Sequence, residues 1–87
     1  MKDPYQVLKY PSATEKSIRL MEAENKLVFV VDRKASKIDI KLAFEEAFKV
    51  KPVKVTTYIT PQGIKKAYIK LPLDQPAIDI ATQLGIM

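Results

Sequence analysis

The chain has 87 residues and a net charge of +5, and it contains neither cysteine nor histidine. A chain of this length forms one domain with a modest core, and the missing residue types exclude disulfides, thiolate metal sites and the usual general base near neutral pH. The longest uncharged apolar run, residues 27–31, is too short for a membrane span or the apolar part of a signal peptide. We therefore expect a soluble intracellular protein.

The first quarter of the chain predicts a short strand followed by a helix. Residues 5–10 lie between two prolines, Pro4 and Pro11, which indicates a brief edge strand. Ser12 and Glu15 have the spacing of a capping box, so a helix is predicted from there to about Glu22. Its apolar stripe would consist of Ala13, Ile18, Leu20 and Met21.

Residues 26–32 predict a strand, because residues 28–31 are all β-branched or aromatic. Leu27, Phe29 and Val31 would share one face, while Val28 and Val30 would share the other. A strand that is apolar on both faces is usually central and covered on both sides.

A second capping signal, Ser36 to Asp39, predicts a helix that ends at about Lys49. Glu45 and Lys49 have the spacing of a stabilising surface pair on this helix. A buried stripe follows the helical period and consists of Ile40, Ala43, Phe44, Ala47 and Phe48.

Residues 53–60 and 64–71 are predicted to form a β-hairpin around Pro61-Gln62-Gly63. Proline presets φ at the first turn position and glycine supplies a positive φ at the last, as a three-residue loop requires. This loop sets Val55 opposite Ile69 and Thr57 opposite Ala67, which gives one consistent apolar face. The other face would hold the pairs Lys54/Lys70, Thr56/Tyr68 and Tyr58/Lys66.

A short third helix is predicted to start at Asp74-Gln75-Pro76 and to end at Gly85, with Ile78, Ala81 and Leu84 facing inward. The order strand-helix-strand-helix-strand-strand-helix predicts the α+β class: a small sandwich with a mostly antiparallel four-stranded sheet and helices packed on it. We expect the first two helices to cover one face of this sheet. The third helix would then cover Val28 and Val30.

The positive charge is concentrated in the middle of the chain. Residues 26–70 hold eleven basic and four acidic residues, and residues 47–73 hold six lysines and no acid. A stretch of one sign on a folded domain is expected of a protein that binds a polyanion. The alternative is a lysine-rich surface that serves solubility or heat stability alone.

One face of the predicted hairpin combines this charge with aromatic rings. Tyr58 and Tyr68 alternate there with Lys54, Lys66 and Lys70, so the face offers both stacking surfaces and phosphate partners for RNA. The alternative is an ordinary solvated strand face, because tyrosine and threonine are common in strands. Lys65 would lie on the apolar side of the hairpin and reach solvent at its tip.

Catalysis is not expected. Glu45 and Glu46 are adjacent on a predicted helix and point in different directions, so they cannot share a site. The chain has only two glycines, Gly63 and Gly85, and therefore no glycine-rich phosphate loop. Acylphosphatases have a similar size and rough architecture, but they use a glycine-rich anion-binding loop, which this chain lacks.

Several segments together resemble the universal large-subunit ribosomal protein twenty-three family, in its short archaeal and cytoplasmic-eukaryotic form. The most specific is Lys65-Lys66-Ala67-Tyr68 after a Pro-x-Gly turn. Many relatives have asparagine at position 56, where this chain has Thr56, which lacks the bidentate edge of an amide. The matching segments keep the family's order over nearly the whole chain: Thr14-Glu15-Lys16-Ser17, 25–29, 37–48, 53–57, 61–63, 65–71 and 80–86.

The resemblance implies a structural component of the large ribosomal subunit that binds its ribosomal RNA near the nascent-chain exit tunnel. It also implies a contribution to a docking site for factors such as the signal recognition particle. Bacterial relatives carry a long hairpin loop that reaches into the tunnel, whereas this hairpin is closed by residues 61–63 alone. Residues 1–87 would form a single RNA-binding ribosomal domain in the cytoplasm, beside neighbouring large-subunit proteins, with no cofactor, small-molecule substrate or membrane insertion.

The resemblance and the basic stretch together give the expected site residues. Glu15 matches the acid that the family associates with factor docking, and the predicted capping box gives it a structural role that does not exclude the first. The alternative function is a free-standing basic adaptor that binds RNA or protein, which would not stay with the large subunit through a high-salt wash. The expected RNA contacts are Lys9, Thr14, Lys16, Lys26, Arg33, Lys34, Lys37, Lys41, Lys54, Thr56, Tyr58, Lys65, Lys66, Tyr68 and Lys70.

Overall fold

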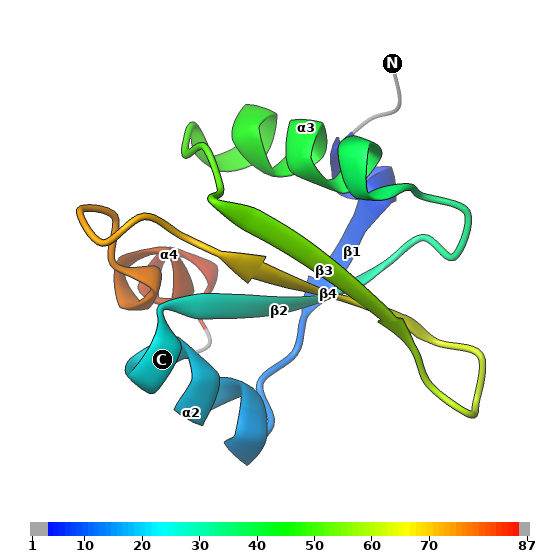
Figure 1. The fold of residues 1–87 in the computed structure, drawn as a ribbon, viewed down its shortest axis with the longest axis horizontal. Helices are drawn as coiled ribbons and strands as arrows, with labels where there is room; N and C mark the ends of the chain where they lie inside the picture. The colour runs from blue at the N-terminus through cyan, green and yellow to red at the C-terminus, as the bar shows by residue number, and fades with distance from the viewer. Residues whose placement is uncertain (1–3, 86–87) are drawn as a thin grey trace.

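A four-stranded antiparallel sheet with helices on both of its faces forms the centre of the computed structural model, which describes residues 4–85 (Figure 1). The strand order is β1-β2-β4-β3, and all neighbours are antiparallel. The predicted fold class is confirmed, with one additional helical turn at the start. The elements are α1 (Pro4–Val7), β1 (Leu8–Pro11), α2 (Glu15–Glu24), β2 (Lys26–Val31), α3 (Lys37–Phe48), β3 (Lys54–Ile59), β4 (Lys65–Lys70) and α4 (Ala77–Leu84).

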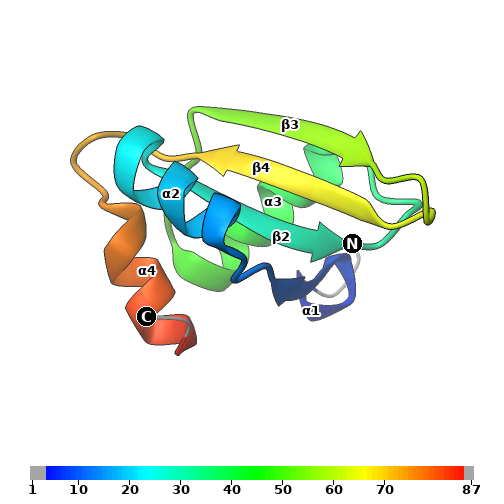
Figure 2. The same ribbon diagram turned by 90° about the horizontal axis from the view of Figure 1, so that it is seen from below.

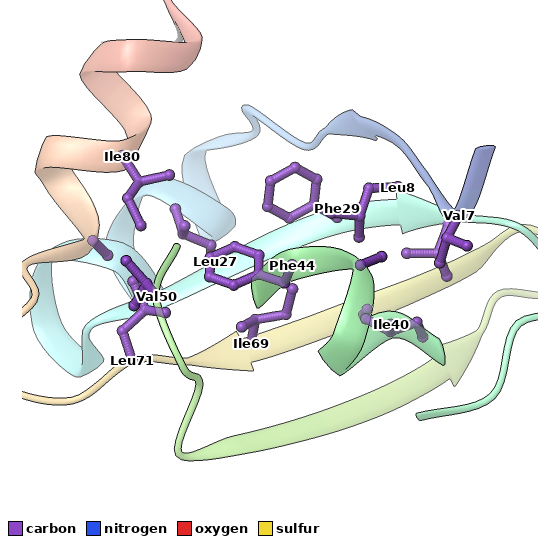
Figure 3. Packing of buried hydrophobic residues seen from close by; sticks show 14 of the residues in the cluster. Val7, Leu8, Leu27, Phe29, Ile40, Phe44, Val50, Ile69, Leu71 and Ile80 are labelled. Carbon is purple, nitrogen blue, oxygen red and sulfur yellow. The ribbon is translucent and has the colours of Figure 1, made fainter. Parts of the chain in front are cut away.

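The strand β2 lies between β1 and β4, and residues 27–31 are all buried, as the two apolar faces predict. Leu27, Phe29 and Val31 face α3 and join its buried residues in one hydrophobic cluster (Figure 3). The rings of Phe29 and Phe44 meet edge to face at 6.1 Å, and those of Phe44 and Phe48 lie 4.8 Å apart. The burial of these apolar side chains is the main contribution to the stability of the domain.

The helices α2 and α3 lie on opposite faces of the sheet, so the expectation that they share one face is wrong (Figure 2). On the face away from α3, Ser17 and Leu20 of α2 line a crevice together with Val28 and Tyr68. α2 therefore covers Val28, and α4 does not. A single residue, Asn25, separates α2 from β2, so the helix has to lie close to the strand that follows it.

The third helix, α4, contributes to the same cluster as α3. Its buried residues are Ala77, Ile80 and Ala81, and Leu84 is half-buried, while Ile78 is 43% exposed, contrary to the prediction. Pro76 is the residue before the helix rather than its first residue. The buried stripe of α4 follows the helical period from Ala77 through Ile80, Ala81 and Leu84, and Ile78 lies outside this stripe. Gly85 ends the helix with φ +76°, as predicted.

The start of α2 also differs from the prediction. The capping residue is Thr14, whose Oγ1 accepts a hydrogen bond from the Ser17 amide at 3.3 Å. The Ser12 amide instead donates to the Val28 carbonyl at 2.8 Å, which extends the pairing of β1 with β2. Ser12 is therefore engaged with the sheet, and Glu15 is the first helical residue rather than half of a capping box.

The start of α3 is as predicted. Ser36 Oγ accepts from the Asp39 amide at 3.2 Å, and the Asp39 carboxylate accepts from the Ser36 amide at 3.0 Å. Ile40, Ala43 and Phe44 are buried. The predicted Glu45–Lys49 pair is not formed: Lys49 ends the helix with φ +59°, and Glu45 Oε1 is buried without a hydrogen-bond partner.

The two edges of the sheet differ. β1 is shorter than the strand predicted over residues 5–10, because residues 4–7 form the helical turn α1. Its register against β2 shifts between Leu8 and Tyr10, and it ends at Pro11. A bulge and a proline are features that keep an edge strand from pairing further. β3 forms the other edge, and its register with β4 shows no such shift.

The hairpin β3–β4 has the predicted three-residue loop and register. The Gly63 amide donates to the Thr60 carbonyl at 2.8 Å, which closes the turn, and Gly63 has φ +84°. Val55 pairs with Ile69 and Thr57 with Ala67, so the apolar side chains share one face. Ile69 and Ala67 are fully buried there.

The amide side chain of Asn25 connects α2, β2 and the segment before α4. Its Nδ2 donates to the carbonyls of Leu71 at 3.2 Å and Pro72 at 2.9 Å, and its Oδ1 accepts from the Ala77 amide at 2.6 Å. Asn25 itself has φ +55°, a left-handed conformation that asparagine tolerates better than most residues. One residue therefore ends α2 and fixes the start of α4.

We expect Gly63→Val to lower the free energy of unfolding by about 1–2 kcal/mol, because a β-branched residue resists a positive φ. A Cβ at this position would meet Arg33 Nη1 at 3.5 Å, an ordinary contact, so the cost comes from the backbone rather than from a clash. Chemical denaturation measures it. Gln62→Val at the neighbouring exposed loop position is the control and should change stability little. Equal stabilities of the two variants would contradict the strained-turn explanation.

Candidate nucleic-acid interface

Three rows of side chains cross the sheet on the face opposite α3. In each row the residues of β2, β4 and β3 lie directly opposite one another, so they share this face. The register brings together the hairpin side chains that the sequence predicted for one face. The rows are Lys26, Lys70 and Lys54; then Val28, Tyr68 and Thr56; then Val30, Lys66 and Tyr58.

The helix α2 covers the β2 side of this face and leaves the hairpin side open (Figure 2). A hollow remains between the helix and the hairpin, and Lys16 of α2 lines it together with Thr56, Tyr58 and Tyr68. We call the surface formed by Lys16, Lys26, Lys54, Thr56, Tyr58, Lys66, Tyr68 and Lys70 the lysine–tyrosine face.

The charges of this face are largely unneutralised. Lys54 and Lys70 lie directly opposite each other, and like charges in this arrangement destabilise a sheet. Lys26 pairs with Glu24 at 3.2 Å, and among residues 4–85 neither Lys54 nor Lys70 has an acidic partner within ion-pair distance. The fold tolerates this repulsion, and an anionic ligand would relieve it.

Several predicted RNA contacts lie away from the lysine–tyrosine face. Lys9 is exposed on β1 at the other edge of the sheet, and Lys34 is exposed in the turn after β2. Lys37 and Lys41 of α3 line a separate hollow with Pro52 and Val53. Arg33 reaches the tip of the hairpin, near Gly63.

Two predicted contacts are already engaged within the fold. Lys65 is half-buried, and its Nζ donates to the Ala35 carbonyl at 2.5 Å. The expectation that it reaches solvent at the hairpin tip is therefore wrong, because the segment before α3 lies within reach of its ammonium group. The Thr14 hydroxyl caps α2 and also bonds to Ser17 Oγ at 3.2 Å.

Sequence reasoning missed Tyr10. The structure pairs it with Val30, which places it on the same face as Lys66 and Tyr58, and it is 55% exposed. The shifted register between Leu8 and Tyr10 lets Leu8 point into the core while Tyr10 points to the opposite face. No local signal in the sequence specifies such a bulge.

Residues 4–85 contain no cluster of three or more histidine, cysteine, aspartate or glutamate side chains able to hold a metal ion. Over the same residues, no helix is long and apolar enough to cross a membrane.

Known proteins resemble this chain over nearly its full length. The family model described as ribosomal protein L23 matches residues 6–79. The large ribosomal subunit protein uL23 of Methanothermobacter thermautotrophicus is 51% identical over 84 residues, which cover 97% of this chain and 98% of the relative. The protein of the same name from Methanococcus aeolicus is 49% identical with the same coverage.

We expect Lys70→Thr to stabilise the isolated protein by up to about 0.5 kcal/mol at low salt, because Lys70 is the central charge of a row of three lysines and lies directly opposite the other two. The gain should shrink as salt rises and screens the repulsion. Denaturation at several salt concentrations measures both effects. Lys9→Thr on β1 is the control, since the register gives Lys9 no lysine opposite it. A stability difference that does not depend on salt would show that charge repulsion is not its cause.

Proposed function

We propose that this chain, which belongs to the ribosomal protein L23 family and so is a structural protein of the large ribosomal subunit, binds large-subunit ribosomal RNA through its lysine–tyrosine face. The observation that carries the proposal is the row of Lys26, Lys70 and Lys54 beside the half-buried Tyr68, with the exposed Tyr58 one row further along. Lysines neutralise phosphates and tyrosines stack on bases, so the face offers both kinds of RNA contact. Residues 1–87 would act together as one RNA-binding domain of the cytoplasmic ribosome.

The second part of the proposal is a protein-docking surface near the exit of the nascent chain. Glu15 supports it: its side chain is 81% exposed, and its contact is a surface pair with Arg19 at 2.7 Å on the same helix. Without a capping box, the acid is not needed to close the helix start. We propose that Glu15 contributes to the binding of factors such as the signal recognition particle.

The short loop of the hairpin limits how far the protein could extend into the exit tunnel. Its loop consists of Pro61-Gln62-Gly63 and is tightly closed by the Thr60–Gly63 hydrogen bond. We propose a position beside the exit tunnel, with neighbouring ribosomal proteins, in which this hairpin does not form an extension along the tunnel wall.

The alternative that the sequence left open is a free-standing basic adaptor that binds RNA or protein transiently, and membership of the L23 family argues against it. The unneutralised lysines would suit either role. Sedimentation of a lysate separates the two: stable co-migration with the large subunit through a high-salt wash supports the ribosomal role, and complete release supports the adaptor.

RNA binding should be strongly salt-dependent if the lysine–tyrosine face carries it. Should about six phosphates be neutralised, the affinity for a large-subunit RNA fragment falls by about a thousandfold between about 50 and 200 mM salt. Lys66→Ala should reduce the slope of log affinity against log salt by about one unit. Equilibrium titration at several salt concentrations measures both quantities. A nearly flat dependence would exclude an electrostatic interface.

Glu15→Ala should weaken factor docking while leaving RNA binding intact. The loss of an exposed ion pair at a helix start costs at most about 1 kcal/mol of stability, so the folded protein should still enter large subunits. Purified signal recognition particle is titrated onto subunits that carry the wild type or the variant. Glu22→Ala, an exposed acid on the same helix, is the control. Equal affinities for wild type and Glu15→Ala would remove Glu15 from the docking surface.

A further inference from the structure

The hollow between α2 and the hairpin has one aromatic side chain held in place and a second at its open side. Tyr68 lies in the middle of β4, between Val28 and Thr56 in the register, and is half-buried. It also lines the crevice under Ser17 and Leu20 of α2, so it has neighbours on both sides. A ring that is packed in this way loses little conformational entropy when a ligand stacks on it.

Tyr58 lines the same hollow from β3 and is 52% exposed. It is the diagonal neighbour of Tyr68, because its direct partner is Lys66, two residues before Tyr68 on β4. Diagonal neighbours across a sheet lie about 7–8 Å apart, which leaves room for one flat ring between the two tyrosines. Within residues 4–85, the close ring–ring contacts are among phenylalanines, so no aromatic side chain of these residues stacks on Tyr58 or Tyr68, and both tyrosines line the hollow.

Positive charge surrounds the two rings. Lys54 and Lys70 lie in the row on one side of Tyr68, and Lys66 lies in the row on the other side. The rows are about 7 Å apart, since they are two residues apart along the strands. Lys16 adds a positive charge from the α2 side, because it lines both the hollow and the adjacent crevice.

A base within an RNA duplex cannot use this arrangement. Its faces are covered by the neighbouring base pairs, so a duplex would present only phosphates, sugars and groove edges to the protein. A nucleotide that has left the stack can place its base against a tyrosine and its flanking phosphates on lysines at either side.

We infer that the hollow binds one unpaired nucleotide of RNA, with its base stacked on Tyr68 and Tyr58 and Lys16 at its phosphate. The inference rests on the proposed function, since it names the part of the RNA that the lysine–tyrosine face takes. Thr56 lines the hollow and supplies a single hydroxyl, so it cannot read a base edge with two hydrogen bonds. The site would therefore bind a base mainly by stacking, with little preference among the bases.

The test uses two RNA probes: a single-stranded oligoadenylate of about sixteen nucleotides, and the duplex that it forms with oligouridylate. This length lies within the range of site sizes of proteins that bind single strands. The chain has four tyrosines and no tryptophan, so quenching of tyrosine fluorescence reports binding, and the leucine variants show which rings are quenched. The variants are Tyr68→Leu and Tyr58→Leu, with Tyr68→Phe and Tyr58→Phe as matched controls that keep the ring. Tyr58 is exposed, so its leucine variant remains informative if Tyr68→Leu fails to fold.

We expect the single strand to quench tyrosine emission of the wild type. Each leucine variant should lose about five- to a hundredfold in affinity for the single strand, and each phenylalanine variant should lose less than about threefold. Duplex affinity should be unchanged by all four substitutions.

Two outcomes separate this inference from the proposed function. Leucine variants that bind the single strand as tightly as the wild type would overturn the nucleotide site and leave RNA binding by the lysines intact. A wild type that binds neither probe at about 50 mM salt would overturn the proposed function itself, since lysine contacts to phosphate are strongest there.

Discussion

The arrangement of this molecule depends on the position of Asn25. This residue ends α2 in the left-handed conformation, and its amide bonds to the Leu71 and Pro72 carbonyls and to the Ala77 amide. A buried or half-buried polar group costs free energy unless it is bonded, so several bonds from one side chain fix one geometry strongly. Because β2 begins at the next residue, the same geometry sets α2 over one face of the sheet. The hollow beside Tyr68 lies next to the first turn of this helix, where Lys16 lines it.

A second constraint is the alternation of side chains along the hairpin. Val55, Ala67 and Ile69 point toward α3, and the residues between them point to the opposite face. A slip of one residue would bury lysines and expose the core, which is far more costly than the repulsion between two exposed lysines. The tight turn at Gly63 therefore determines both the core and the lysine–tyrosine face. The cost of opposed charges on that face is small beside the burial that the register secures.

Local signals predicted the parts of the fold that local interactions determine. The capping box at Ser36 and the turn at Gly63 are formed by residues close in sequence, and both predictions are confirmed. The start of α2 was predicted wrongly, because the Ser12 amide bonds to Val28, a residue far along the chain. Which face each helix covers is also a tertiary property, since the apolar stripes of α2 and α3 are compatible with either face.

The same distinction applies to the site. The alternation of lysine and tyrosine on the hairpin could be predicted, because it follows from the strand period alone. The hollow could not, since it requires α2 to lie across the sheet. The bond from Lys65 to the Ala35 carbonyl and the orientation of Tyr10 depend on a loop and a bulge that no sequence pattern marked.

The helix α2 connects the two surfaces that the proposed function distinguishes. Glu15 and Lys16 are adjacent on this helix and therefore point about 100° apart. Lys16 lines the hollow on the sheet, whereas Glu15 is exposed and pairs with Arg19 along the helix surface. RNA that occupies the hollow would contact α2 from one side only and would leave the Glu15 side accessible. A protein partner could then bind while the RNA stays in place, because the two ligands use different sides of one short helix that Asn25 holds at its end.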